Sequence, residues 1–182
     1  MKITISGKAG SGKSTIAKML SEKLNLNHYS IGDLMRAIAI EKGMTLPELN
    51  KLAENDSSID FELDNKLKEL GKAKDNFVVD GRLAAFFIPQ SDARVFLEAD
   101  DKVRAGRILK DKRQQEKSRS LKEAMTSIKK REESERKRYK KYYGVNYLDK
   151  KLYNYAVDTT KLTPEQVVER IINFIRAKQK SL

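Results

Sequence analysis

A glycine-rich segment near the N-terminus has the residue types and the spacing that bind a triphosphate. Residues 7–14, GKAGSGKS, match G-x-x-x-x-G-K-[ST] at every fixed position. In such a loop the backbone N–H groups turn inward around phosphate oxygens, the lysine bridges the β- and γ-phosphates, and the serine hydroxyl ligates Mg²⁺. The candidate residues are Gly7, Lys8, Ala9, Gly10, Ser11, Gly12, Lys13, Ser14 and Thr15, with Lys13 as a catalytic group.

Two further short motifs carry arginines that can hold a second phosphate. Residues 30–36, SIGDLMR, place Arg36 one turn into an expected helix, where a two-pronged phosphate contact is possible. Residues 77–82, FVVDGR, read as an apolar strand that ends in Asp80, Gly81 and Arg82, with Asp80 placed to orient Mg²⁺. The blander alternatives are a solvated helix residue for Arg36 and a surface turn for Arg82.

A charged stripe runs along an expected long helix over 121–143. Ala124, Ile128, Arg131, Glu135 and Arg138 share one face, which is apolar at first and then charged. Charged groups on an inward face need a partner, so an anionic ligand is one interpretation. The other is ion pairing within the helix, since Arg131 and Glu135 are four residues apart.

The pattern of apolar residues predicts strands and helices that alternate along the chain. This alternation is typical of an α/β fold with a mostly parallel sheet covered by helices on both faces. The expected strands are 2–6, 28–31, 77–79, 95–97 and 155–157. The expected helices are 15–24, 32–42, 45–55, 59–70, one from 100 or 101, 121–143, and one from 163 onward.

The composition excludes several kinds of site. The chain has 182 residues, enough for one domain, and it has no cysteine and a single histidine. A disulfide scaffold, a thiolate zinc site, a cysteine nucleophile and a histidine-based triad are therefore excluded, and His28 is expected to be structural. No run approaches ~18 apolar residues, so we expect a soluble, cytoplasmic protein without a membrane partner.

The excess positive charge is concentrated in one quarter of the chain. Residues 102–151 contain 19 Lys and Arg against 7 Asp and Glu, which accounts for the whole net charge of +12. Such a segment is either a solvated basic surface or one that meets the phosphates of a nucleotide or a nucleic acid.

Taken together, the P-loop, SIGDLMR, VVDGR and the basic helix resemble the nucleoside monophosphate kinases. Asp-Gly-Arg without an intervening aromatic-proline pair resembles cytidylate kinase rather than adenylate kinase. Leu83-Ala84-Ala85 and the later REESERKRY are similar to the archaeal type of cytidylate kinase. The resemblance implies a single domain over 1–182, a sheet of strand order 2-3-1-4-5, a helical acceptor-binding insertion at about 32–72 and a short lid at about 111–120. It also implies ATP and Mg²⁺ as donor and cofactor, CMP and dCMP as acceptors, and a monomer.

The same resemblance assigns roles to individual residues. The implied catalytic groups are Lys13, Arg36, Arg82, Arg107, Arg131 and Arg138. The implied acceptor-binding residues are Ser30, Asp33, Arg36, Asp80, Gly81, Arg82, Arg131, Glu135 and Arg138. Ser14 and Asp80 are implied as metal ligands, Arg113 as an ATP contact, and Arg104, Arg107, Arg113 and Arg119 as arginines flanking the lid.

Other functions compete with this reading. Adenylate kinase is the alternative within the same class, and shikimate kinase shares the strand order and the P-loop but leaves VVDGR and the basic helix unexplained. An RNA-binding P-loop ATPase is the alternative from another class. We rank it lower because Arg36 and Arg82 lie outside the basic segment yet suit a pocket for an acceptor phosphate.

Overall fold

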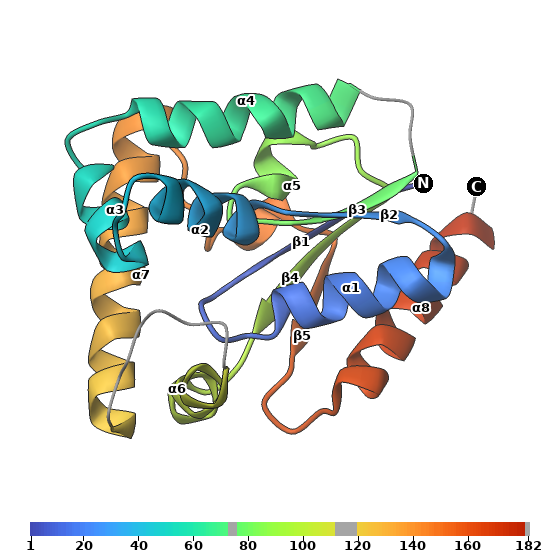
Figure 1. Cartoon of the computed structure of the whole chain (residues 1–182). Helices are drawn as coiled ribbons and strands as arrows, with labels where there is room; N and C mark the ends of the chain where they lie inside the picture. The colour runs from blue at the N-terminus through green and yellow to red at the C-terminus, as the bar shows by residue number, and fades with distance from the viewer. Residues whose placement is uncertain (73–75, 112–119, 181–182) are drawn as a thin grey trace.

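A parallel sheet forms the centre of the molecule. The computed structural model describes residues 1–72, 76–111 and 120–180. Their five strands all pair in parallel, in the order β2-β3-β1-β4-β5, which confirms the expected order (Figure 1). The strands are β1 (Lys2–Gly7), β2 (Asn27–Ser30), β3 (Phe77–Asp80), β4 (Ala93–Glu98) and β5 (Tyr155–Asp158).

Helices cover both faces of this sheet. On one face α1 (Lys13–Leu24) and α8 (Pro164–Lys180) pack together against side chains of β1, β3, β4 and β5. On the other face α4 (Ser58–Lys72) and the short α5 (Ala84–Phe87) pack against β3. The strands therefore bury apolar residues on both sides, as a parallel sheet in an α/β protein requires.

Three helices between β2 and β3 form a subsidiary unit. These are α2 (Ile31–Glu41), α3 (Leu46–Leu52) and α4, and they share an apolar cluster of their own that is centred on Leu49. They span the segment expected as a helical insertion. A capping box between Thr45 and Glu48 starts α3 as its sequence predicts.

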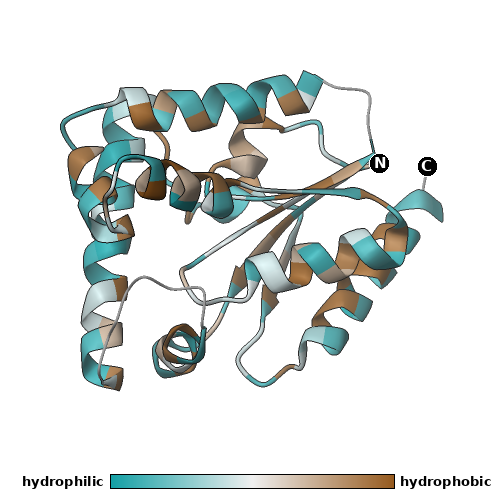
Figure 2. Ribbon diagram, in the orientation of Figure 1, coloured by the Kyte–Doolittle hydropathy of each residue, from teal (hydrophilic) through white to brown (hydrophobic). Residues whose placement is uncertain are grey.

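The second half of the chain adds α6 (Asp101–Lys110) and the long α7 (Leu121–Tyr143). Asp100 caps α6 and Ser120 caps α7 through their side-chain oxygens, and Gly144 ends α7 in a left-handed conformation. Figure 1 shows α7 standing across the carboxyl ends of the strands, beside α2 and α3. It is hydrophilic over most of its length, unlike the strands in the centre of the molecule (Figure 2).

Two small elements were not expected from the sequence. They are α5 and a 3₁₀ turn at Lys150–Leu152. Both are too short to show a periodic pattern of hydrophobic residues, so they can be recognised only in the folded structure.

None of the helices in the described part of the chain has the length and apolar character needed to cross a lipid bilayer.

The turn after β1 depends on glycines with unusual backbone angles. Gly7 has φ +146°, and a Cβ placed there would lie 2.1 Å from the carbonyl oxygen of Leu97 on the neighbouring strand. Gly10 has φ +73°, and its Cβ would lie 2.5 Å from the carbonyl oxygen of Arg104. Gly7 and Gly10 therefore allow the turn to pack closely against β4 and α6.

We predict that Gly7→Ala lowers the free energy of unfolding by roughly 2–5 kcal/mol, because it combines backbone strain with a steric clash. Urea denaturation would measure the loss. The matched control is Gly106→Ala on α6, where a Cβ meets nothing within 4 Å, so the change should stabilise the helix by about 0.5–1 kcal/mol. Equal stability of the two variants would contradict this account.

Candidate active site

The loop between β1 and α1 has the shape of an anion cradle. Gly7, Gly10 and Gly12 all have positive φ, and α1 begins without a side-chain cap, so its first N–H groups are left for a ligand. The Ser11 hydroxyl is buried and has no hydrogen-bond partner among the described residues. Lys13 Nζ donates to the carbonyl oxygen of Lys8 at 2.8 Å, which folds the lysine back over the loop.

Arg104 supports this loop from beneath. Its guanidinium donates to the carbonyl oxygen of Ala9 at 2.9 Å, to Glu132 at 2.6 Å and to Asp101 at 2.5 Å. Glu132 in turn accepts from the N–H of Ala9 at 3.2 Å, so α6 and α7 grip the loop together. Arg104 is almost completely buried, at 1% exposure. It was expected among the lid arginines, but it is buried under the loop and both of its terminal nitrogens bond to the protein, so it holds the loop instead.

Asp80 lies at the centre of a hydrogen-bonded cluster at the end of β3. Its Oδ2 accepts from Ser14 Oγ at 2.9 Å and from Ser30 Oγ at 3.2 Å, and its Oδ1 lies 2.8 Å from Nε2 of His28. The structure thus brings together the expected Ser14, Ser30 and Asp80. His28 was expected to be only structural, but it is a direct partner of the site aspartate.

These oxygens suit Mg²⁺, which binds hard oxygen donors and retains water or phosphate in its other positions. Ser14 Oγ, in the first turn of α1, and Asp80 Oδ2, at the end of β3, are neighbours beside the P-loop. Within the described residues there is no cluster of three or more metal-binding side chains. A metal at this position would therefore complete its shell with phosphate oxygens and water.

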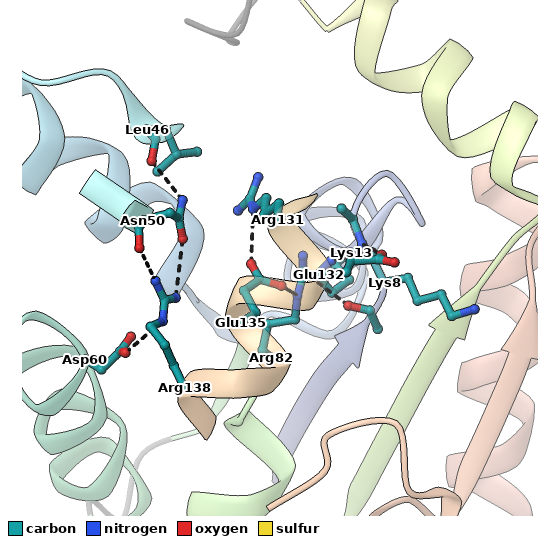
Figure 3. A network of polar contacts seen from close by, with 12 residues as sticks. Lys8, Lys13, Leu46, Asn50, Asp60, Arg82, Arg131, Glu132, Glu135 and Arg138 are labelled. Atoms are coloured by element: carbon teal, nitrogen blue, oxygen red, sulfur yellow. Dashed lines mark hydrogen bonds and ion pairs between the residues drawn. The ribbon is translucent and has the colours of Figure 1, made fainter. Parts of the chain in front are cut away.

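A buried carboxylate joins two arginines next to Lys13. Glu135 on α7 accepts from Arg82 Nε at 2.7 Å through one oxygen and from Arg131 Nε at 3.0 Å through the other (Figure 3). Arg82 also donates to the carbonyl oxygen of Gly7 at 2.8 Å. The intrahelical pair expected from the sequence therefore forms, and it also orients Arg131 in the wall of the cavity. The anionic ligand stays a prediction.

The charges of this group shift each other's protonation. Burial alone would raise the pKa of Glu135, but Arg82 and Arg131 outweigh it and lower that pKa to about 2. Burial, and then the charge of Arg82, hold the pKa of Lys13 well below its usual value. This concentration of cations disfavours one more positive charge, and a polyanionic ligand would relieve the repulsion.

Arg138 connects α7 to the three-helix unit. Its guanidinium donates to the carbonyl oxygen of Asn50 at 2.7 Å and to the side-chain oxygen of Asn50 at 3.3 Å, while Nε lies 3.1 Å from Asp60 (Figure 3). It is 2% exposed. Arg138 therefore holds α3 and α4 in position and forms part of the cavity wall. Its guanidinium group is engaged by the protein and does not extend freely toward a ligand.

Arg36 and Arg107 line the cavity from opposite sides. Arg36, on α2, pairs with Asp33, and Asp33 itself is exposed and does not line the cavity. Arg107 donates to the side-chain and backbone oxygens of Thr159 at 2.9 and 2.7 Å. Arg113, Arg119 and most of the expected lid lie outside the described residues.

Many of these groups line one cavity of about 480 Å³. It extends from the P-loop, past Arg82 and Arg131, to α2 and α4, where Asp60 and Asp64 form part of the lining. Of the expected site residues, the following contribute to its wall: Ala9, Gly10, Ser11, Gly12, Lys13, Ser14, Thr15, Arg36, Asp80, Gly81, Arg82, Arg107, Arg131, Glu135 and Arg138. Gly7, Lys8 and Ser30 support that wall from behind.

Sequence reasoning missed several residues of the site. They are His28, Asn50, Asp60, Asp64, Glu132 and Thr159. A signal for two of them exists, since Asp60 and Asp64 follow the same helical period as the buried Ile59, Leu63 and Leu67. Carboxylates at positions that face inward are a reason to suspect a site.

Burial raises the pKa of Asp64 to about 7, and the neighbouring Asp60 adds to the effect. Tyr143 donates to its Oδ2, while Lys68 and Arg138 act in the opposite direction to burial. Asp64 thus titrates near neutral pH in the folded protein.

The comparisons with known proteins agree with this geometry. The model of the cytidylate kinase-like family matches residues 2–161. The chain belongs to that family. It is 38% identical to the cytidylate kinase of Haloarcula marismortui over 178 residues, which cover 97% of this chain and 90% of that protein. It is 37% identical to the cytidylate kinase of Archaeoglobus fulgidus, over 98% of this chain and 97% of that protein.

Among solved structures, the fold is similar to that of a shikimate kinase from Bacteroides thetaiotaomicron. The TM-score is 0.69, with 20% sequence identity over 97% of this chain and 98% of that one. At this identity the likeness concerns the fold alone, and it agrees with a sheet built around a P-loop.

We predict that Asp64→Asn changes how stability depends on pH. The pKa of Asp64 in the folded protein lies above its unfolded value of 3.8. The protonated carboxyl therefore makes its full contribution to the free energy of unfolding below about pH 4. This contribution is lost as the pH rises through 7, by up to about 4 kcal/mol. Urea unfolding of the wild type between pH 4 and 8 should show this decline, and the variant should lack it.

The matched control is Glu69→Gln, which removes one exposed carboxylate from the same helix. Its stability curve should run parallel to that of the wild type. If Asp64→Asn also ran parallel, Asp64 would not be the titrating group.

Proposed function

We propose that this protein transfers the γ-phosphoryl group of ATP to CMP and dCMP, giving the nucleoside diphosphate and ADP. The observation that carries the proposal is the single cavity that joins the P-loop to the helices α2–α4, with Lys13, Arg82 and Arg131 between its two ends. Membership of the cytidylate kinase-like family and the names of the archaeal relatives support the same activity.

The reaction needs little covalent help from the protein. An oxygen of the acceptor phosphate is already anionic, so it attacks the γ-phosphorus without a general base, and the bond from that phosphorus to the β-bridging oxygen breaks. Catalysis then consists of aligning two polyanions and neutralising the charge that spreads over the transferred group. Lys13, Arg82 and Arg131 are placed for this task, and Glu135 holds the two arginines in position.

The donor is expected to occupy the P-loop end of the cavity. There the N–H groups at the start of α1 and the Ser11 hydroxyl offer hydrogen bonds to phosphate oxygens. Ser14 and Asp80 would hold Mg²⁺, which when bound neutralises phosphate charge. Arg107 and Arg113 remain the candidates for contacts from the lid side.

The acceptor is expected to occupy the end that is lined by α2 and α4. We expect Arg36, which lines this end of the cavity, to bind its phosphate, while Arg138 fixes α3 and α4 around it. Ser30 orders the start of α2, because its hydroxyl accepts from the N–H of Asp33 and donates to Asp80. We further propose that the insertion at about 32–72 is the acceptor-binding unit, and that the protein acts as a cytoplasmic monomer.

A substrate panel tests the proposed function. Initial rates of ADP formation with ATP and Mg²⁺ should be highest with CMP and dCMP among CMP, dCMP, UMP, AMP, shikimate and RNA, at both low and high salt. A preference for AMP would replace cytidylate with adenylate kinase activity. Hydrolysis that only RNA stimulates, with a steep dependence on salt, would favour the nucleic-acid-binding ATPase.

Two variants on α7 separate the site from the general basic charge. Arg131→Gln removes a cation beside the transferred group, so kcat should fall by roughly 10²–10³-fold. Lys140→Gln removes an exposed charge from the same helix and should change kcat less than about twofold. A comparable loss in both variants would show that α7 acts through its overall charge.

A further inference from the structure

Two carboxylates on α4 face the acceptor end of the cavity although they are buried. Asp60 and Asp64 are 4% and 5% exposed, and they lie one helical turn apart. Buried carboxylates are costly unless each is paired or hydrogen-bonded, and two neighbouring ones repel each other as well. Keeping both carboxylates buried costs stability, which points to a role other than stabilising the fold.

The protein satisfies these groups only in part. Asp60 Oδ2 lies 3.1 Å from Arg138 Nε, yet both atoms are without a well-directed hydrogen bond. Asp64 Oδ2 accepts from the Tyr143 hydroxyl. Among the described residues, the structure records no hydrogen bond to Oδ1 of either carboxylate. Both side chains line the cavity, so hydrogen-bond acceptors are left over at this end.

The neighbouring wall is apolar. Ile31 and Met35 of α2, and Leu63 and Leu67 of α4, line the same end of the cavity. Apolar walls with a few polar groups at one edge are the usual surroundings of a planar heterocycle. Phosphate groups, by contrast, are bound by arginine and lysine side chains; Arg36 on α2 is available for the acceptor phosphate, while Lys13, Arg82 and Arg131 line the cavity nearer the P-loop.

We propose that Asp60 and Asp64 read the amino edge of the acceptor base, so that an amino base such as cytosine is accepted and the keto base uracil is rejected. This inference rests on the function proposed above and assigns the residues that select its substrate. Asp60 and Asp64 act as specificity-determining residues, while Tyr143 and Arg138 position them.

The donor and acceptor patterns of the two pyrimidines explain the selection. Cytosine presents an amino donor at N4 beside an acceptor at N3, whereas uracil presents an acceptor at O4 beside a donor at N3. A carboxylate accepts from the amino group, but it meets O4 of uracil as acceptor against acceptor. Leaving such buried groups unpaired is the source of strong discrimination between otherwise similar substrates.

The protonation of the pair suits both positions of the cytosine edge. Burial raises the pKa of Asp60, while the charge of Arg138 acts in the opposite direction and favours the ionised form, which accepts from the amino group. The pKa of Asp64 of about 7 makes its protonated form available, and that form donates to N3. Adenine presents the same pair of groups, so these carboxylates distinguish amino from keto bases and leave the size of the base to the apolar walls.

The test compares kcat/KM for CMP and UMP in the wild type, Asp60→Asn, Asp64→Asn and the exposed control Glu69→Gln. An amide can donate to O4 of uracil, so the CMP/UMP ratio should fall at least tenfold in the Asp60 or Asp64 variant and stay unchanged in Glu69→Gln. An unchanged ratio in both site variants would overturn the inference. A change confined to the CMP/dCMP ratio would also overturn it, because the carboxylates would then bind the ribose.

A second measurement keeps the test valid if a variant does not fold, as judged by circular dichroism. The wild type is assayed with the monophosphate of pyrimidin-2-one riboside, which lacks the 4-amino group of cytosine. We expect at least a tenfold lower kcat/KM than with CMP, and a smaller penalty in any folded Asp60 or Asp64 variant. Equal rates with CMP and the analogue would contradict the inference.

The same assays separate the two proposals. If the wild type phosphorylates no nucleoside monophosphate, the proposed function fails. If it phosphorylates CMP but the variants keep the wild-type selectivity, the proposed function stands and only the assignment of Asp60 and Asp64 fails.

Discussion

The arrangement of the site depends on the buried carboxylate of Glu135. It accepts from Arg82 at the end of β3 and from Arg131 on its own helix, so it fixes α7 against the sheet at the level of the P-loop. A buried carboxylate without partners would be strongly unfavourable, and two arginines this close together would repel each other. Each charge is therefore tolerated only because the others are present, which makes the geometry both rigid and sensitive to the loss of any member.

The long helix α7 transmits this constraint in two directions. Toward its N-terminal end, Glu132 binds Arg104 and the N–H of Ala9, so the helix holds the phosphate loop. Toward its C-terminal end, Arg138 binds Asn50 and lies against Asp60, so the same helix holds α3 and α4. One element thus contacts both ends of the cavity and sets their spacing, and precise positioning is what a transfer between two bound groups depends on.

Part of the positive charge of residues 102–151 is buried inside the folded protein. The net charge of this segment suggested a broad cationic surface. The guanidinium groups of Arg104, Arg107 and Arg138, however, donate hydrogen bonds to oxygens of the protein itself. Lys140 and other residues on the outer side of α7 stay in solvent. The arginines of this segment are thus partly structural, because guanidinium groups can satisfy several acceptors at once in a fixed geometry.

The sequence by itself determined the features that depend on neighbouring residues. The P-loop is contiguous, the helix starts at Thr45, Asp100 and Ser120 follow from their capping side chains, and alternating apolar runs predicted the parallel sheet. Only the tertiary structure decided which charges meet. Asp80 with His28, Arg82 with Glu135, and Arg138 with Asn50 are 52, 53 and 88 residues apart. Local spacing carries no information about such pairs, since burial and the packing of distant elements select each partner.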